Sequence, residues 1–283
     1  MVAEHLTASA HAGSATSTAS DFAVDVRGIS KQFTDSRGRI VQALQDVSFR
    51  VRAGEIVALT GQSGCGKTTM LRIIMGLETP TSGSVTVDGI PVKGCGPDRG
   101  IVFQHAELLP WRTALGNVVF ALAARGVPKG ERRAIAENSL ELVGLAHAMD
   151  RHPHELSGGM RQRVGLARAL AIDPKVLLMD EPFSALDAQT REVMQGELLE
   201  IQARTGKTIL FVSHDLDESV LLADRVVAML PNPGRLQAIV DTPLDRTQPI
   251  GERRGSAQLA ELRHELWKLI HVDTSAVEES EQS

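Results

Sequence analysis

The sequence has no tyrosine, and aromatic residues make up only 3% of its 283 residues. A platform of stacked rings for single-stranded nucleic acid needs more aromatic side chains than this. A nucleic-acid surface is also normally basic, whereas the formal net charge of this chain is −5. We therefore expect no nucleic-acid partner.

Cysteine is scarce, because Cys65 and Cys95 are the only two. Two cysteines do not make a disulfide framework in a chain of this length. Both are therefore predicted to be free thiols, which fits a reducing compartment.

Long apolar runs are missing as well. No stretch approaches the roughly 20 apolar residues that a membrane-spanning helix needs. The N-terminus also lacks the basic region and apolar core of a secretory signal. A function at a membrane would therefore require docking onto partners that span it.

What the chain does contain changes along its length and predicts three parts. Residues 1–20 are mostly Ala, Ser, Thr and His and are expected to be a disordered tail. Residues 21–250 alternate between short apolar runs and amphipathic stretches, as a folded domain does. Residues 251–283 are expected to form a helical extension, with an amphipathic helix at 257–271 and an acidic tail. Trp267 is predicted to pack on the apolar face of that helix.

Strand-like and helical segments alternate over most of the folded part. The run Val176–Met179 is apolar throughout, which is typical of a strand buried on both faces. Strands alternating with helices predict an α/β fold with a parallel sheet covered on both sides. The predicted strands are Phe22–Val26, Val47–Val51, Ile56–Leu59, Val85–Val87, Gly100–Phe103, Val176–Met179, Thr208–Val212 and Val226–Leu230. The predicted helices are Lys67–Leu77, most of 113–146 with a break at Gly126–Pro128, Gly159–Ile172, Asp217–Ala223 and 257–271.

The strongest motif is a glycine-rich loop between the apolar strand Ile56–Leu59 and a helix. Its glycines allow a tight wrap in which backbone N–H groups point at phosphate oxygens, and the helix N-terminus adds its positive dipole end. Lys67 is predicted to neutralise the β- and γ-phosphates of ATP, and the Thr68 hydroxyl to bind Mg²⁺. The loop consists of Gly61, Gln62, Ser63, Gly64, Cys65, Gly66, Lys67, Thr68 and Thr69.

A glycine-rich turn can match this motif by accident, but the odds of a match in such a chain are roughly one in a hundred. GTPases, kinases and helicases also carry the loop. A GTPase should contain Asn-Lys-x-Asp to bind guanine, and the sequence has no such run. The choice among the other classes depends on the remaining motifs.

Two acids, Asp180 and Glu181, follow the buried strand Val176–Met179. The carboxyl end of a strand is where doubly wound sheets bind ligands. Asp180 is predicted to hold Mg²⁺ through water, and Glu181 to act as the general base for the attacking water. Two exposed acids in a turn would be the better interpretation of Asp-Glu-Pro in a chain without a phosphate loop.

A second anion site is predicted where Leu-Ser-Gly-Gly precedes the helix Gly159–Ile172. Ser157 can cap this helix, while Gly158 and Gly159 leave its N–H groups open. Plain helix capping by Ser157 is the simpler interpretation, and the two are compatible because the cap presents the donors.

From about Phe22 to Val240 the chain resembles the nucleotide-binding subunit of ABC (ATP-binding cassette) transporters. The Leu-Ser-Gly-Gly at 156–159 is similar to the signature motif that separates this family from other phosphate-loop ATPases. The resemblance implies that 21–250 is an ABC ATP-binding domain. Its fold would be a RecA-like P-loop NTPase core with an antiparallel β subdomain and an α-helical signature subdomain inserted at about 105–172.

The resemblance also implies roles for four further residues. Gln104, after the strand Gly100–Phe103, matches the glutamine loop, which binds Mg²⁺ and senses the membrane partner. Asp187 ends the Ser-Ala-Leu-Asp of the D-loop, and His214 matches the switch histidine that contacts the γ-phosphate. Phe33 lies where the family places an aromatic residue that stacks on adenine, although a lone Phe after a strand more often belongs to a core.

The family works as a head-to-tail dimer, so the resemblance implies a second copy of this chain as a partner. Ser157–Gly159 of one copy would face the phosphate loop, Asp180 and Glu181 of the other, with ATP and Mg²⁺ between them. Hydrolysis would remove the γ-phosphate bridge and let the two copies part. That cycle would drive an integral membrane permease.

Two segments resemble the ATPase subunits of nitrate, sulfonate and taurine importers, namely Leu108–Thr113 and Pro231–Leu236. This resemblance implies a peripheral position on the cytoplasmic face of the inner membrane and, indirectly, an extracytoplasmic solute-binding protein. Leu108, Leu109 and Trp111 would form a patch that docks onto the permease if they are exposed. Packing inside the helical subdomain is an equal alternative for this segment.

Other classes stay open at this point. A soluble ABC ATPase of DNA repair or translation usually has long coiled-coil insertions or two cassettes, and this chain has one cassette. A clamp that binds ATP without hydrolysing it would lack Glu181 or His214, and both are present. Some exporters, like importers, are built from separate subunits.

Overall fold

The computed structural model describes residues 22–246 and 248–271. The predicted tail at 1–20 and the acidic tail of the chain lie outside these ranges. Within the ranges, Cys65 is buried and Cys95 exposed, and both are free thiols as predicted. None of the helices described there combines the length and apolar character that a membrane crossing needs.

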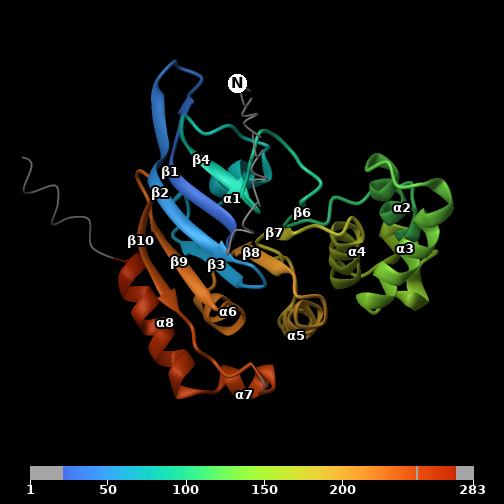
Figure 1. Cartoon of the computed structure of the whole chain (residues 1–283). Helices are drawn as coiled ribbons and strands as arrows, with labels where there is room; N and C mark the ends of the chain where they lie inside the picture. Colours follow the sequence, from blue (N-terminus) through green and yellow to red (C-terminus); the bar gives the residue numbers. More distant parts are fainter. Residues whose placement is uncertain (1–21, 247, 272–283) are drawn as a thin grey trace, which may run out of the picture.

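The strands form two sheets (Figure 1). The larger has the order β10-β9-β3-β8-β7-β6 and is parallel except for β10, which is antiparallel to β9. The smaller is antiparallel, with the order β2-β1-β4-β5. The α/β fold expected from the sequence is confirmed. The strands are β1 (Phe22–Thr34), β2 (Ile40–Arg52), β3 (Ile56–Gly61), β4 (Ser82–Val87), β5 (Ile90–Pro91), β6 (Arg99–Val102), β7 (Val176–Asp180), β8 (Thr208–Val212), β9 (Arg225–Leu230) and β10 (Arg235–Asp241).

The parallel sheet is buried on both faces. Along β3, Ile56 and Ala58 belong to one apolar cluster, and Val57 and Leu59 belong to the other. Successive side chains of a strand point to opposite faces, so a strand covered on both sides must be apolar at every position. This explains why the central strands could be read directly from the sequence.

Helices cover the sheet on each side. α1 lies between the two sheets, and its Met70, Leu71 and Ile74 are packed in the cluster that also holds β1 and β2. The opposite face carries α4, α5, α6 and α8. The helices are α1 (Lys67–Met75), α2 (Ala114–Ala124), α3 (Lys129–Leu142), α4 (Gly158–Ala171), α5 (Ala188–Thr205), α6 (Leu216–Leu222), α7 (Ile250–Arg254) and α8 (Ala257–Ile270), with 3₁₀ turns at Ala146–Ala148 and Pro153–Glu155.

A helical group formed by α2, α3 and α4 extends from the edge of the parallel sheet that ends in β6 (Figure 1). Thr113 caps α2 by accepting a hydrogen bond from the Gly116 N–H. The predicted break between α2 and α3 is confirmed, because Gly126 adopts a φ of 75° and Pro128 precedes α3.

The C-terminal helix corrects one prediction. Leu259, Leu266 and Ile270 of α8 are buried, but Trp267 is 51% exposed and stacks on His271 at 4.6 Å between ring centroids. Trp267 follows Leu266 directly, so its side chain points about 100° around the helix from the buried stripe. Trp267 therefore does not pack on the apolar face.

Candidate functional site

The glycine-rich loop lies between β3 and α1, at the carboxyl end of a central strand. A Cβ on Gly61 would collide with the carbonyl oxygen of Met229, and one on Gly66 would lie 2.5 Å from a methyl of Leu44. Gly66 also has a φ of 87°, in the left-handed region that favours glycine. The loop is thus held in one shape by its neighbours, and that shape exposes the first N–H groups of α1.

The loop lines one side of a pocket of about 370 Å³. The other side comes from the ends of β7 and β8, and from β2. Nine residues line the pocket, namely Ala43, Ser63, Gly64, Gly66, Lys67, Thr68, Thr69, Glu181 and His214. The structure therefore brings most of the predicted phosphate-binding loop together with two of the predicted catalytic residues. Ala43 was not identified from the sequence, because it carries no functional group and belongs to no motif.

Lys67 is only 7% exposed, and its amine is held inside the curve of the loop. Its Nζ donates hydrogen bonds to the carbonyl oxygens of Gly61 at 2.8 Å and Gln62 at 3.1 Å. A positive charge fixed behind a ring of backbone N–H groups suits the phosphates of a nucleotide.

Thr68 and Asp180 form the candidate metal site. The Thr68 hydroxyl donates a hydrogen bond of 3.2 Å to Oδ1 of Asp180. Burial raises the pKa of the Asp180 carboxyl above its usual range and the charge of Glu181 adds to this, while the hydrogen bond from Thr68 opposes it. A cation bound here would offset that cost of ionisation.

The oxygen pair fits Mg²⁺, which prefers hydroxyl and carboxylate oxygens and commonly takes its other ligands from phosphates and water. Among the residues that the structure describes, no group of three or more His, Cys, Asp or Glu side chains is arranged to hold a metal ion. A site made of one or two protein oxygens together with a nucleotide is consistent with that finding.

Glu181 occupies an unusual backbone conformation, with a φ of 44°. Such a conformation costs about 1–3 kcal/mol in a residue other than glycine and is found mostly at functional sites. Its N–H donates to the carbonyl of Val212 at 3.1 Å, and the Ser184 hydroxyl donates to its carbonyl at 2.9 Å. These bonds hold the turn, and they leave Oε2 of Glu181 at 3.3 Å from Nδ1 of His214.

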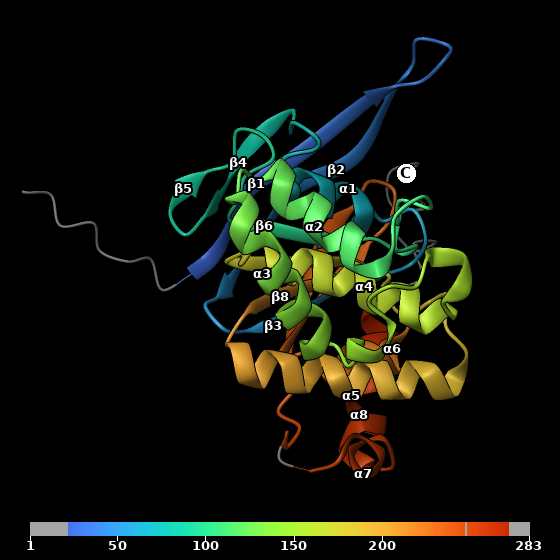
Figure 2. The same ribbon diagram turned by 90° about the vertical axis from the view of Figure 1, so that its right-hand side faces the viewer.

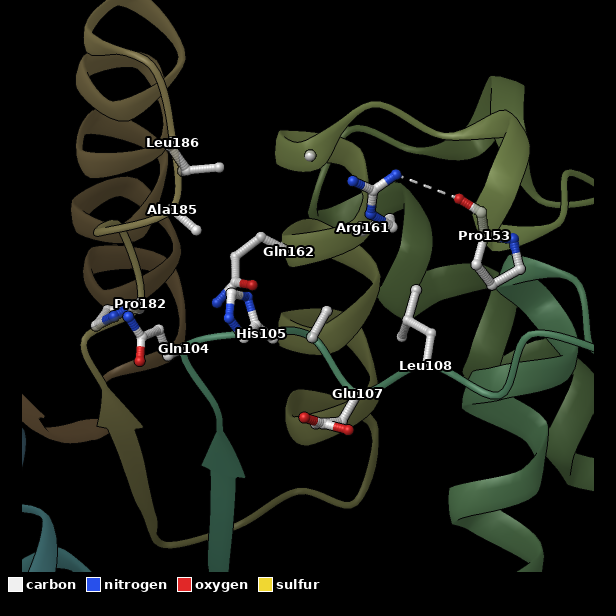
Figure 3. Close-up of a pocket in the computed structure, with 12 residues that line it drawn as sticks. Gln104, His105, Glu107, Leu108, Pro153, Arg161, Gln162, Pro182, Ala185 and Leu186 are labelled. Atoms are coloured by element: carbon white, nitrogen blue, oxygen red, sulfur yellow. Dashed lines mark hydrogen bonds between the residues drawn. The ribbon is translucent and has the colours of Figure 1, made fainter.

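Gln104 does not line the phosphate-loop pocket and lies instead in a neighbouring hollow of about 230 Å³. Figure 3 shows it beside Pro182, with Ala185 and Leu186 above and Arg161 of α4 across the hollow. Gln162 of α4 donates to the carbonyl of Phe103 at 3.0 Å and so fastens the segment before Gln104 to the signature helix. The structure thus places Gln104 in a hollow that Arg161 and Gln162 of α4 also line.

The predicted helix cap at Ser157 is confirmed, and Asp187, which the resemblance placed in the D-loop, caps a second helix. Ser157 Oγ accepts from the Met160 N–H at 3.2 Å at the start of α4, and Asp187 Oδ1 accepts from the Thr190 N–H at 2.9 Å at the start of α5. Ser157 and Gly158 are exposed. Among the described residues of this one chain, the phosphate-loop pocket takes no lining residue from Ser157–Gly159. The predicted second anion site is therefore separate from this pocket within one chain.

Phe33 is 39% exposed, so the alternative of a core position for it does not hold. It pairs with Val41 across the β1–β2 hairpin, two residues before Ala43 of the pocket. Its ring lies 4.8 Å from the amine of Lys31, a cation–π contact. The exposed ring remains a candidate for stacking on adenine.

In the segment Leu108–Thr113, some residues pack inside the helical subdomain and another is exposed as a docking patch would be. Leu108 packs partly against the main apolar cluster, and the backbone of Leu109 is held by the buried Asn117, whose Oδ1 accepts its N–H at 2.7 Å. Trp111, in contrast, is 72% exposed. Of the three residues of the predicted docking patch, Trp111 is the most exposed.

A small cavity of about 50 Å³ behind Glu181 and His214 was not predicted. It is lined by Glu218 of α6 and Arg191 of α5, and both Glu218 Oε1 and Arg191 Nε are buried without a hydrogen-bond partner among the described residues. Water bridging two such groups is the ordinary solution. The only sign of this cavity in the sequence was Glu218, an acid four residues after His214.

Comparison with known proteins gives concordant results. The profile of the family described as ABC transporter matches residues 44–184. The chain is 48% identical over 245 residues to an uncharacterised ABC transporter ATP-binding protein of Methanocaldococcus jannaschii, covering 87% of this chain and 90% of that protein. It is 42% identical to the nitrate transport protein NasD of Klebsiella oxytoca, covering 88% and 96%. It is 52% identical to the taurine import ATP-binding protein TauB of Yersinia pestis, covering 69% and 76%.

Solved structures agree with the fold. One similar structure is a dimeric ATP-binding cassette in a post-hydrolysis state bound to ADP and Pi, with a TM-score of 0.69 and 32% identity, covering 78% of this chain and all of that one. Another, CbiO1 of Clostridium perfringens, is described as part of an ABC transporter complex, with a TM-score of 0.71 and 28% identity, covering 88% of this chain and all of that one.

Proposed function

Because the chain belongs to the ABC transporter family as an ATP-hydrolysing, ATP-binding subunit, we propose that it energises import of a small anionic solute through a separate membrane permease. In this proposal the subunit sits peripherally on the cytoplasmic face of the inner membrane. An extracytoplasmic binding protein delivers the solute, so this chain does not touch the cargo.

One observation carries the proposed mechanism, namely the separation of the two anion sites on one chain. Lys67 and Thr68 line one pocket, whereas Ser157 and Gly158 lie exposed at a helix start that does not line it. A nucleotide bound to the first pocket would meet the second site only on another copy. This supports a head-to-tail dimer, and a similar solved cassette is described as dimeric with ADP and Pi bound.

The residues divide the work in the proposed cycle. The loop N–H groups and Lys67 bind the phosphates, and Thr68 and Asp180 orient the Mg²⁺ that, when bound, neutralises phosphate charge. Glu181 accepts a proton from the attacking water. His214, 3.3 Å from that carboxylate, contacts the γ-phosphate. Cleavage releases the γ-phosphate, which both copies bind. The free energy that favours the closed dimer over the open one is then lost.

The permease is proposed to dock beside Gln104. An open groove of about 310 Å³ runs between β6 and the helical group, lined by Ile101, Phe103, Arg125 and Arg168 among others. Trp111, the exposed residue of the predicted docking patch, lies on the segment that links β6 to α2. Movement transmitted to this groove would reach Gln104 and the start of α4 together, since both line the neighbouring hollow.

Import of a small anion is supported by the names of the relatives, which describe nitrate transport and taurine import. The test is reconstitution of the subunit with its permease and binding protein in vesicles, followed by ATPase and uptake assays with nitrate, taurine and an alkanesulfonate. We expect one of these solutes to stimulate ATP hydrolysis and to accumulate inside the vesicles. A complex that hydrolyses ATP but responds to none of them would contradict the proposed solute class.

A further inference from the structure

The C-terminal helix α8 reaches the phosphate loop at a single hydrogen bond. Nε2 of Gln62 donates to the carbonyl oxygen of Ile270 at 2.8 Å, although the two residues are 208 positions apart. Ile270 is the last residue of α8, and the final carbonyls of a helix have no donor within the helix. The Gln62 amide therefore supplies the donor that the last carbonyl of α8 lacks, and α8 in turn restrains the Gln62 side chain.

Gln62 is not among the described residues that line the nucleotide pocket, whereas Ser63, Gly64 and Gly66–Thr69 are. Its side chain is bonded to α8, while its backbone carbonyl accepts a hydrogen bond of 3.1 Å from the amine of Lys67. One residue thus connects the C-terminal helix to the charged group of the loop.

The acceptor on α8 is fixed in place. Leu266 and Ile270 are 0% and 5% exposed and pack in the main apolar cluster. α8 contacts α6, β9 and β10 and lies along the edge of the parallel sheet (Figure 1). In the turned view, α8 and α7 lie beyond α5, on the side away from the β1–β2 hairpin (Figure 2). A rigid acceptor of this kind restricts where Gln62, and with it the amine of Lys67, can lie.

We propose that α8 is a brace for the phosphate loop and that Gln62 is the positioning residue through which it acts on Lys67. The proposal rests on nucleotide binding at this loop. It gives the C-terminal extension a role in the ATPase reaction that no motif assigns to it. It also makes α8 sensitive to the state of the loop, because a bond that positions Gln62 is strained or released when the loop moves.

The test uses a near-isosteric change that removes only the donor, Gln62→Met. Loss of one hydrogen bond of this kind should raise the Kd for ATP about 3- to 10-fold. The matched control is Gln258→Met, because Gln258 also lies on α8 and its Nε2 donates to the Pro243 carbonyl at 3.3 Å, away from the loop. The control should change the Kd by less than about twofold.

A second readout separates positioning from a general loss of structure. Trp111 and Trp267 are the only tryptophans, so Trp111→Phe leaves Trp267, three residues before Ile270, as the sole indole. ATP should change the fluorescence of Trp267 in this background, and Gln62→Met should abolish the change at saturating ATP. Ile270→Ala keeps the acceptor carbonyl but removes the buried side chain that anchors the end of α8. Combining it with Gln62→Met should raise the Kd by about as much as the larger single effect, since both changes act on the same link.

An unchanged Kd and an unchanged ATP response of Trp267 in Gln62→Met would overturn the brace. So would independent effects that multiply in the double variant. These outcomes are distinct from failure of the nucleotide site, in which the chain with its natural residues would bind no ATP and both proposals would fall.

Discussion

Nδ1 of His214 lies 3.3 Å from Oε2 of Glu181, although the two residues follow different strands. The strands β7 and β8 are parallel neighbours, with Asp180 paired to Val212. Their carboxyl ends therefore open on the same edge of the sheet, where doubly wound folds bind ligands. Glu181 and His214 thus meet in the pocket that the phosphate loop also lines.

Lys67→Ala is expected to weaken ATP binding itself. The variant removes a buried positive charge from the curve of the loop, and hydrogen bonds to charged groups contribute about 1.5–3 kcal/mol, or roughly 10- to 150-fold in Kd. Isothermal titration calorimetry measures the change. Lys129→Ala is the control, because Lys129 is also the first residue of a helix but is exposed on α3. An ATP affinity unchanged by Lys67→Ala would count against the phosphate-loop assignment.

Trp111→Glu is expected to uncouple the subunit from its permease while leaving the ATPase activity of the isolated chain intact. The side chain is 72% exposed, so a charge there should not disturb the fold, but it would oppose an apolar contact. Co-purification with the tagged permease is the measurement. Trp267→Glu is the matched control, since Trp267 is 51% exposed on α8. If the Trp111 variant still co-purified, the docking surface would lie elsewhere.

Glu218 should make stability depend on pH. Burial raises its pKa to about 8, with the charges of Asp215 and Glu181 adding to the shift and Ser213 and Arg191 opposing it. An unfolded chain ionises this carboxyl near 4.5. Between these values the folded chain binds more protons than the unfolded chain, so stability falls as pH rises, by up to about 1.4 kcal/mol per pH unit from this group. Below about pH 4.5 the carboxyl of Glu218 is protonated in both states, so it causes no loss of stability.

Glu218→Gln removes that titration and should gain stability relative to the natural chain as pH rises from about 5 to about 8. Urea midpoints at several pH values in this window measure the difference. Glu261→Gln, a change of an exposed acid on α8, should show no such trend. A stability difference for Glu218→Gln that stays constant with pH would contradict a raised pKa.

The central strands and the phosphate loop could be predicted because their signals are local. β7 is apolar at its first four positions and β8 at its last four, and the loop is a contiguous motif between a strand and a helix. β10 could not be predicted, because it is a half-exposed strand at the edge of the sheet and follows a proline-rich turn. Edge strands lack the continuous apolar run on which a sequence reading depends.

α5 was missed for a related reason. Its buried residues are Met194, Gln195, Leu198 and Ile201, with none in its first six positions, so its beginning shows no apolar stripe. The positions of Gln104 and Gln62 were also beyond the sequence. Gln104 lines a hollow together with residues of α4, and Gln62 bonds to Ile270, 208 positions away. Both depend on how distant elements pack, which no local pattern contains.

The most direct measurement of the central claim is the behaviour of Glu181→Gln with ATP and Mg²⁺. Its steady-state ATPase rate and its mass by light scattering should be recorded on the same preparation. We expect hydrolysis to fall by roughly 10²–10⁴, as for loss of a general base, and the chain to shift from monomer to a stable ATP-bound dimer. Near-normal hydrolysis, or a variant that binds ATP and stays monomeric, would contradict a composite site in which Glu181 cleaves ATP held between two copies.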